Sequence, residues 1–333
     1  MQLTIKALRE LTTKALLHYG YTAEESVVIS SVLLYAQLRD SNQGVVKLTG
    51  AGIPKNPNAS TPTLTKDTKL SAFMDAHGTH AMLAINQATD LLISKAQVHS
   101  LAIVGVNHIN TSSGAIGYYA KKIAESGLIG LVFAGSMESV AAHGSFEALF
   151  GTNPLAIGVP TNHEPLVLDM ATSAMAYYGV VEADLAGRVL PPNIAFDKNG
   201  QATTTPKDVL DGGALRTFDQ GPKGSGLSML VQILTGPLLD SYFTGFGDIK
   251  NNWGGHLLIA IDPELLGGLE SLKTGVEQMI TKVKASQKLP DITEIFVPGE
   301  HGNRLTKTAL DSDSITLEDN LYAALTALTN PNS

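Results

Sequence analysis

Residues 151–175 read GTNPLAIGVPTNHEPLVLDMATSAM, and this stretch decides the fold class. A Gly-Thr-Asn-Pro turn precedes a first apolar run, Leu155–Val159, and a second apolar run over residues 166–168 ends in Asp169. Short apolar runs bounded by turn residues predict buried strands. The small residues over 169–175 then predict the start of a helix, where free backbone N–H groups favour an anion.

A second stretch, residues 221–226, reads GPKGSG and introduces an apolar helix that we predict over residues 224–242, with a kink or break at Pro237. It again places small residues at a helix start. Lys223 in this stretch has two open interpretations, a cation for a phosphate or ribose and a solvated loop lysine. The chain has neither a G-x-G-x-x-G fingerprint nor a G-x-x-x-x-G-K-[ST] loop, so neither standard phosphate-binding turn is predicted.

The composition is that of a folded acidic protein. The chain has 333 residues, 44% of them hydrophobic and 16% charged, which is enough apolar material for a sizeable core. The net charge of -8 disfavours nucleic acid and anionic membranes as partners. The chain has no cysteine, no apolar signal segment at its start and no run long enough for a membrane span. We therefore expect a cytoplasmic protein with a small-molecule partner, no nucleic acid and no membrane.

Hydrophobic periodicity predicts alternating helices and strands, which indicates an α/β or α+β fold. A capping box at residues 22–25 (Thr-Ala-Glu-Glu) marks one helix start clearly. The predicted helices cover residues 5–19, 22–39, 80–97, 114–126, 224–242, 271–285 and 316–328, the last capped by Thr316. The predicted strands cover residues 101–106, 128–134, 155–159, 166–168, 256–261 and 294–297.

Three histidines carry candidate chemistry. His77 and His80 are three residues apart, a spacing that can bind a metal, but no further ligand motif accompanies them. We therefore predict no metal site. His108 lies in a polar loop after a predicted strand, where an imidazole could serve in acid/base catalysis or simply be a surface residue.

Several blocks of the chain, taken together and in order, resemble the malate/L-lactate dehydrogenase family that lacks a Rossmann fold. They are GYYA at 117–120, GTNP at 151–154, LDMATS at 168–173, LAGRVLP at 185–191, DKNG at 197–200, TTTP at 203–206, GPKG at 221–224 and LTGPLL at 234–239. The resemblance implies a helical N-terminal region over 1–110, a nucleotide-binding domain with a largely antiparallel sheet over 111–284, and a segment over 285–333 that returns to the first region. It also implies a homodimer and NAD or NADP as cofactor.

By resemblance, the cofactor contacts fall on four separate parts of the chain. They are Ser136; Asp169, Met170, Ala171, Thr172, Ser173, Ala174 and Met175; Pro222 and Lys223; and Gly299, Glu300 and His301. These positions include both predicted helix starts. The resemblance therefore favours Lys223 as a ligand rather than a solvated lysine.

The chain departs from the family pattern at the residues that carry the reaction. The family's catalytic histidine falls on Gln43, and its carboxylate-binding arginine falls on Lys47. A second family histidine falls on Ser112 or Ser113, about four residues after His108. Gln43 can hydrogen-bond an oxygen but cannot titrate, and Lys47 keeps the positive charge without the bidentate fork of arginine.

We therefore expect an NAD(P)-dependent oxidoreductase acting on a small 2-oxo or 2-hydroxy acid. His108 would be the acid/base, Lys47 the carboxylate clamp, and Gln43 and Ser112 polar contacts to the reacting oxygen. One alternative is a cyclic imine reductase, because an imine arrives protonated and needs less acid help. Another is a nucleotide-binding family member that has lost turnover along with its histidines. A metal-dependent enzyme using His77 and His80 is the remaining alternative.

Overall fold

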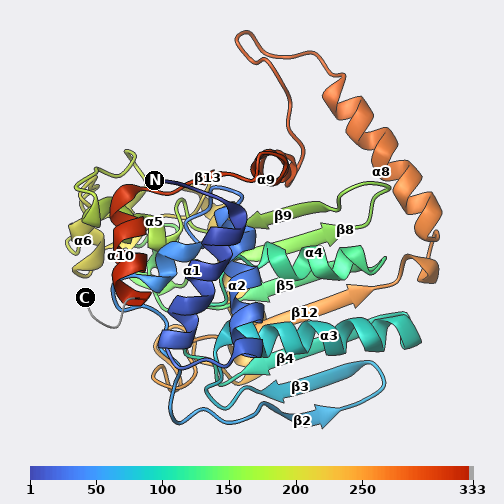
Figure 1. The fold of residues 1–333 in the computed structure, drawn as a ribbon, viewed down its shortest axis with the longest axis horizontal. Helices are drawn as coiled ribbons and strands as arrows, with labels where there is room; N and C mark the ends of the chain where they lie inside the picture. Colours follow the sequence, from blue (N-terminus) through green and yellow to red (C-terminus); the bar gives the residue numbers. More distant parts are fainter. Residues whose placement is uncertain (330–333) are drawn as a thin grey trace.

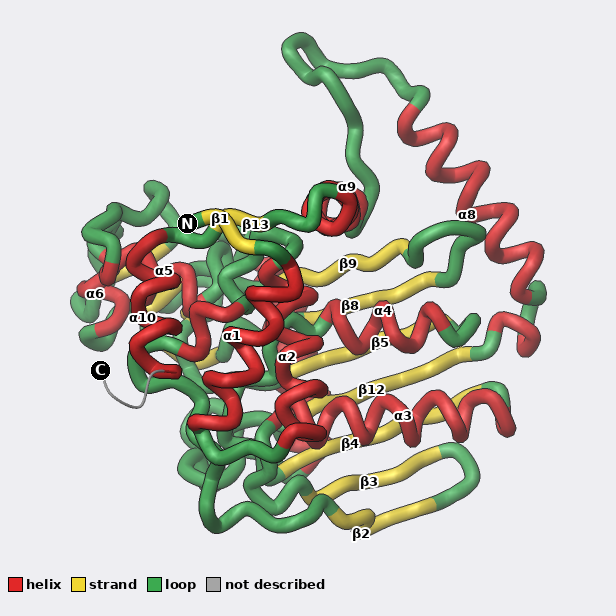
Figure 2. Tube along the Cα trace, viewed as in Figure 1, coloured by secondary structure: helices red, strands yellow, loops and turns green. Residues whose placement is uncertain are grey.

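The computed structural model describes residues 1–329 and is organised around a seven-stranded sheet (Figures 1 and 2). In spatial order the strands are β2 (Thr63–Asp67), β3 (Ser71–Asp75), β4 (Leu101–Asn107), β12 (His256–Ile261), β5 (Ile129–Ala134), β8 (Leu155–Val159) and β9 (Leu166–Met170). Within this sheet only β3 and β4 pair in parallel. The α/β class and the largely antiparallel sheet are confirmed.

The centre of the sheet is a strand from late in the chain. β12 pairs with β4 on one side and β5 on the other, so Ile259 lies opposite both Ile103 and Leu131. The strand reads HLLIAI, and four of its six residues are buried. A nearly continuous apolar run of this kind is typical of a strand covered on both faces. Residues about 150 positions apart in sequence are thereby held in one rigid layer.

Helices cover the sheet and form an N-terminal layer beside it. α3 (Ala81–His99) and α4 (Gly117–Glu125) lie over one face, and α1 (Ile5–His18) and α2 (Ala23–Gln37) stand across its end (Figure 1). α7 (Pro222–Thr235) contacts β5 and β12. The capping box of α2 is present as predicted, with Thr22 and Glu25 bonding reciprocally. α7 ends just before Pro237, which begins the short helix η2 (Pro237–Leu239).

A second, smaller unit lies beside the main sheet. Its four short strands are β10 (Ala195–Phe196), β11 (Ala214–Leu215), β6 (Val140–Ala141) and β7 (Ala148–Phe150), and its helices are α5 (Tyr177–Leu185) and α6 (Pro206–Leu210). A separate core that includes Val140, Val180 and Leu215 holds it together. Strands of two or three residues carry no periodic signal, so this unit was absent from the sequence-based prediction.

The end of the chain returns to its beginning. β13 (Ile315–Thr316) pairs with β1 (Gln2–Leu3), and α10 (Asp319–Thr329) packs against α1. Thr316 therefore lies in a strand and does not cap the last helix, which corrects the prediction. The main sheet contains strands from both sides of residue 110, and residues 330–333 lie outside the described residues. The domain boundaries 1–110, 111–284 and 285–333 stay a prediction.

One helix stands away from the body of the molecule. α8 (Leu269–Lys284) follows the short helix η3 (Pro263–Leu265), and none of its described residues is buried. It leads into an extended segment, residues 285–298, that leaves the body and returns at α9 (Glu300–Asp311) (Figures 1 and 2). The strand predicted over 294–297 is wrong, because this segment has no neighbouring strand to pair with among residues 1–329.

Candidate active site

Lys47 is buried in the short helix η1 (Val45–Leu48). Its side chain is only 2% exposed, and Nζ has no hydrogen-bond partner within residues 1–329. The ammonium lies 3.5 Å from the centroid of the Tyr178 ring in α5, a cation–π contact. Burial lowers the pKa of the Lys47 ammonium to about 7. A buried cation without a counter-ion is costly, which favours a binding role for this residue.

Gln43 lies in the loop that leads into η1. Its amide nitrogen donates to Oδ1 of Asn42 at 3.2 Å, and its backbone N–H donates to the Ser41 hydroxyl. Asn42 in turn lies against α5, since a side chain at Gly179 would come within 3.0 Å of the Asn42 amide nitrogen. The loop around Gln43 therefore shares with Lys47 its contact with α5.

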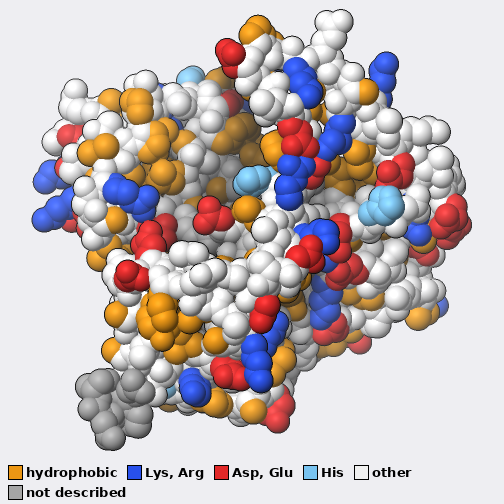
Figure 3. Space-filling view, turned by 45° about the horizontal axis from the view of Figure 1, so that its top comes forward, with side chains coloured by type: hydrophobic (Ala, Val, Ile, Leu, Met, Phe, Trp, Pro, Cys, Tyr) orange, Lys and Arg blue, Asp and Glu red, His pale blue; other side chains and the backbone are white. Residues whose placement is uncertain are grey.

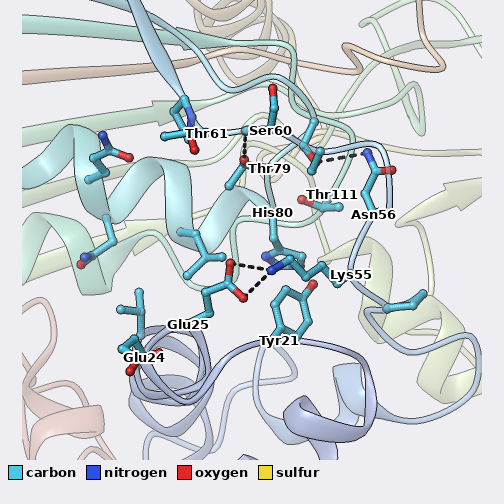
Figure 4. Close-up of a pocket in the computed structure, with 18 of the residues that line it drawn as sticks. Tyr21, Glu24, Glu25, Lys55, Asn56, Ser60, Thr61, Thr79, His80 and Thr111 are labelled. Carbon is cyan, nitrogen blue, oxygen red and sulfur yellow. Dashed lines mark hydrogen bonds and ion pairs between the residues drawn. The ribbon is translucent and has the colours of Figure 1, made fainter.

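His80 caps the N-terminus of α3 and is buried. Its Nδ1 accepts from the backbone N–H of Met82 at 3.3 Å, while its Nε2 has no partner in the described part of the chain. Burial, and next the charge of Lys47, lower the pKa of the His80 ring to about 3. His80 lines a cavity of about 680 Å³ between α2, α3 and the loop around Asn56 (Figure 4). Sequence reasoning considered His80 only as a metal ligand.

His108 lies beside a carboxylate that the sequence did not reveal. Its Nδ1 lies 2.9 Å from Oδ2 of Asp75, at the end of β3, and its backbone N–H donates to Asn252. The other carboxylate oxygen of Asp75 lies 3.2 Å from Nδ1 of His77. The two histidines and the aspartate meet because β3 and β4 pair in parallel and end together. Asp75 was missed because β3 was not predicted.

His77 and His80 do not form a shared site. His77 contacts Asp75 and the Thr63 hydroxyl, whereas His80 is buried under α3. Across residues 1–329, no group of three or more His, Cys, Asp or Glu side chains is placed to hold a metal ion. Ser112, whose hydroxyl accepts from the Gly114 N–H, lies in the loop between His108 and α4.

The stretch over residues 169–175 lies beside the residues that lead into the stretch over 221–226. Ser173 forms a bridge with Thr217, and the Phe218 N–H donates to the carbonyl of Thr172. Residues 169–175 are the end of β9 and a loop rather than a helix start, because α5 begins only at Tyr177. The predicted helix over this stretch is therefore corrected, while its contacts with residues 217–218 lie just before the second predicted cofactor segment.

The N-terminus of α7 already has an anionic cap. Both carboxylate oxygens of Asp219 are used, one accepting from the Gly221 N–H at 2.9 Å and the other from the Gly224 N–H at 3.0 Å. The expectation of free N–H groups at this helix start is therefore wrong. Pro222 and Lys223 are exposed beside this cap. An added anion would have to bind next to Asp219 or displace it.

Ser136 and Asp169 occupy connected parts of the same region. The Ser136 hydroxyl accepts from the Thr152 N–H at 3.0 Å, and Thr152 accepts from Thr172 through its carbonyl. Asp169 accepts from the N–H of Gly117 at the start of α4 at 2.8 Å. Asp169 and Gly299 both line a cavity of about 240 Å³ that Arg39 also borders.

The remaining predicted cofactor residues lie at the start of α9. Gly299 adopts a left-handed conformation (φ +79°), and a side chain there would meet the Val167 carbonyl at 2.8 Å. Glu300 forms ion pairs with Lys284 and Arg304, and His301 contacts the Phe296 ring edge-on. Seen with the top of the molecule turned forward, this side is hollowed near its middle, with hydrophobic side chains and mixed charges around the hollow (Figure 3).

Comparison with known proteins identifies the family. The model of the malate/L-lactate dehydrogenase family matches residues 3–326. The chain belongs to this family. It is 30% identical to a malate dehydrogenase from Pyrococcus abyssi, with 91% of this chain and 87% of the relative covered. Its relatives include dehydrogenases of hydroxy acids, one of them named as using NAD(+), and a cyclic imine reductase, so the family is one of nicotinamide-dependent oxidoreductases.

Two further likenesses refine this picture. A Δ(1)-pyrroline-2-carboxylate/Δ(1)-piperideine-2-carboxylate reductase from Pseudomonas putida is 41% identical over 197 residues. The matched region covers 57% of this chain and 57% of that relative's length. A malate dehydrogenase structure from Entamoeba histolytica superposes with a TM-score of 0.91 at 24% identity, covering 99% of this chain and 97% of that one, which shows the shared fold. In the part of the chain described, no helix is long and apolar enough to cross a membrane.

Proposed function

We propose that this chain reduces a small 2-oxo acid to the 2-hydroxy acid, and catalyses the reverse reaction, with NAD(H) or NADP(H). The observation that carries the proposal is the buried, unpaired ammonium of Lys47, which lies against α5 just after the predicted cofactor stretch. A site of this kind needs an anionic ligand to offset the buried charge. A substrate carboxylate supplies that anion.

Each residue on the predicted substrate side has its own proposed role. Lys47 binds the carboxylate, and the side chains of Gln43 and Ser112 make polar contacts to the reacting oxygen. His108 exchanges the proton, because its Nδ1 lies 2.9 Å from the Asp75 carboxylate and Nε2 is left for the substrate. An aspartate beside the imidazole can orient the ring during proton exchange.

The cofactor supplies the hydride, and four segments would hold it. The hydroxyls around Ser136 and the loop over 169–175 offer donors and acceptors for ribose and amide groups. The exposed ammonium of Lys223 beside Pro222 offers a cation for phosphate. Gly299, Glu300 and His301 border the region from α9, where the bare backbone at Gly299 allows close approach. These groups fit a dinucleotide, and they favour neither NAD nor NADP.

A cyclic imine carboxylate is the second candidate substrate. The likeness to the Pseudomonas putida reductase and the presence of Gln43 in place of a titratable residue both favour it. A protonated imine accepts hydride without needing a proton for a developing alkoxide, so a glutamine suffices there. A cofactor-binding protein without turnover is the third candidate. It is supported by Gln43 and by Ser112 or Ser113, which stand where the family has histidines.

We also propose that the protein is a homodimer. α8 has no buried residue among those described, yet it carries the exposed apolar side chains of Met279 and Val283. The segment that follows adds Leu289, Ile292 and Phe296, also exposed. Apolar side chains gathered on a projecting helix and loop indicate a surface that a second copy covers. The cytoplasmic location stays a prediction.

Titration with NADH and NADPH, followed by addition of 2-oxo acids and cyclic imine carboxylates, tests the proposal. We expect binding of at least one cofactor and its oxidation by members of one substrate class. The ranking of the two classes decides between the first and second candidates.

A further inference from the structure

His108 has an unusual backbone conformation directly after the end of β4. Its φ angle is +52°, in the left-handed region that residues other than glycine seldom occupy. Such a conformation persists where the surrounding contacts impose it. Because the backbone angles set the direction of the Cα–Cβ bond, the contacts that hold the main chain of His108 also decide where its ring lies.

In this conformation the ring of His108 lies beside a carboxylate. Its Nδ1 is shielded from solvent and lies 2.9 Å from Oδ2 of Asp75, whereas the side chain as a whole is 45% exposed. Asp75 is the last residue of β3, and it lies opposite Asn107, the last residue of β4, in the parallel strand pair. The strand pair therefore fixes the carboxylate next to the residue that precedes His108. If His108 left the left-handed region, its ring would turn away from Asp75.

Asn252 holds the main chain of His108 from a loop far along the sequence. Its Oδ1 accepts from the backbone N–H of His108 at 2.9 Å and from the Ser241 hydroxyl at 3.0 Å. Its Nδ2 donates to the Asp240 carbonyl at 3.0 Å, and the residue is only 5% exposed. Two donors on one side and a carbonyl on the other fix which amide atom faces which group. A buried amide held at both ends is rigid enough to impose a backbone geometry on its neighbour.

This contact lies inside a broader junction between the two loops. The Trp253 backbone N–H, next in sequence to Asn252, donates to the Ile109 carbonyl at 2.9 Å. The carbonyl of His108 accepts from the Gly78 N–H at 3.1 Å. Both are bonds between main-chain groups, so a substitution at Asn252 leaves their donors and acceptors in place. The junction should then stay closed while the N–H of His108 loses its acceptor.

We propose that Asn252 is a positioning residue for the proton exchange, because it holds His108 in the conformation that keeps its ring beside Asp75. This assignment rests on the proposed function, in which His108 exchanges the proton. Asn252 acts through the main chain of His108 and not on the substrate. Its loss should therefore lower kcat and leave KM little changed, since misplacing a reacting group slows the chemical step.

A double-mutant cycle tests whether the effect passes through His108. Steady-state kinetics are measured with the best substrate for the wild type, Asn252→Ala, His108→Gln and the double variant. We expect Asn252→Ala to lower kcat by about 10–100-fold in the wild type, with KM changed by less than about twofold. In the His108→Gln background the same substitution should have no further effect on kcat, because two residues that act as a unit are not additive.

Three further variants sharpen the kinetic test. Asn252→Asp keeps an acceptor for the His108 N–H and should recover part of the lost kcat. Asn252→Ser, whose hydroxyl stops short of His108, replaces the alanine variant if that one does not fold. Asn110→Ala is the matched control, because Asn110 donates to the Lys250 carbonyl at 3.2 Å and so joins the same two loops at another point. It should leave kcat unchanged.

NMR of protein labelled only at histidine tests the geometry without turnover. The ring and amide signals of His108 are identified among those of the nine histidines by their loss in His108→Gln. We expect Asn252→Ala to shift the ring Cε1–Hε1 signal and to speed hydrogen exchange of the His108 amide, because the ring leaves Asp75 and the N–H loses its acceptor. Asn110→Ala should change neither signal.

Unchanged ring and amide signals in Asn252→Ala, with the fold intact by circular dichroism, would overturn the positioning role. So would an equal loss of kcat in the wild-type and His108→Gln backgrounds, because the effect would then not pass through His108. Failure of the proposed function looks different. In that case no substrate oxidises the cofactor, or His108→Gln keeps full kcat, while a shifted ring signal in Asn252→Ala still supports the hold of Asn252 on His108.

Discussion

The ammonium of Lys47 lies 3.5 Å from the centre of the Tyr178 ring, which joins the N-terminal layer to α5. Lys47 belongs to the predicted substrate side, and α5 follows the loop over 169–175 that belongs to the predicted cofactor side. A single side-chain contact thus joins the proposed substrate side to the proposed cofactor side. It also explains how a lysine can be buried without a counter-ion, because the ring face offsets part of the lost hydration.

Lys47→Met should stabilise the protein while impairing the reaction. The pKa of Lys47 is about 7 in the folded chain and ordinary, near 10.5, in the unfolded chain. Between these pH values the unfolded chain binds an extra proton, so wild-type stability rises with pH, whereas the methionine variant lacks this rise. We expect a gain on the order of 2 kcal/mol below pH 7, which falls by about 1.4 kcal/mol for each pH unit between pH 7 and pH 10. Chemical denaturation at pH 6 and pH 9.5 measures it, and an equal effect at both would contradict the buried charge.

His108→Gln should lower kcat by about 10²–10⁴-fold if this ring exchanges the proton. Asp75→Asn should reproduce part of that loss, because the amide has the size of the carboxylate but not the negative charge beside the ring. His77→Gln is the matched control, since His77 contacts the same carboxylate from its other oxygen. Steady-state kinetics with the best substrate measure these changes in kcat. An unchanged kcat in His108→Gln would show that His108 does not exchange the proton.

Asp219→Ala should open the N-terminus of α7 to anions. Asp219 now accepts from both Gly221 and Gly224, and these contacts lower the pKa of its carboxyl group. Without that carboxylate the N–H groups are free for phosphate, so inorganic phosphate should raise the melting temperature more in the variant than in the wild type. Asp197→Ala, in another exposed turn, is the control. An identical response to phosphate in all three proteins would contradict a latent anion site.

Met279→Glu should weaken self-association. Met279 is 68% exposed on α8, and a carboxylate there would be desolvated in an apolar interface. Val98→Glu, at a similarly exposed position on α3, is the control. Light scattering after gel filtration should show a dimeric mass for the wild type and Val98→Glu and a lower mass for Met279→Glu. A monomeric wild type would contradict the homodimer.

The sequence predicted the long elements well because their periodicity is local. α1, α2, β4 and β12 all lie within a few residues of their predicted bounds. β3 was not predicted, because its five residues, SAFMD, become a strand only through pairing with β4 and β2. The segment over 294–297 has strand-forming residues but no partner within the described chain, so it stays a loop.

The candidate site was predictable only in part. The family resemblance predicted cofactor contacts at Ser136, Asp169 and Lys223, but it did not reveal the capping of α7 by Asp219, which depends on side-chain geometry. Asp75 beside His108 follows from a parallel strand pair that the sequence did not reveal. His80 was predicted as the first residue of the helix over 80–97, whereas in the structure it is the N-cap of α3.

The most direct test of the account is a fluorescence titration of the protein with NADH and NADPH, followed in the same cuvette by 2-oxo acids and cyclic imine carboxylates. The account predicts that one reduced cofactor binds and is then oxidised when a carboxylate substrate is added. Binding without oxidation by any member of the panel would contradict the proposed activity. Binding of neither cofactor would contradict the assignment of the cofactor segments as well.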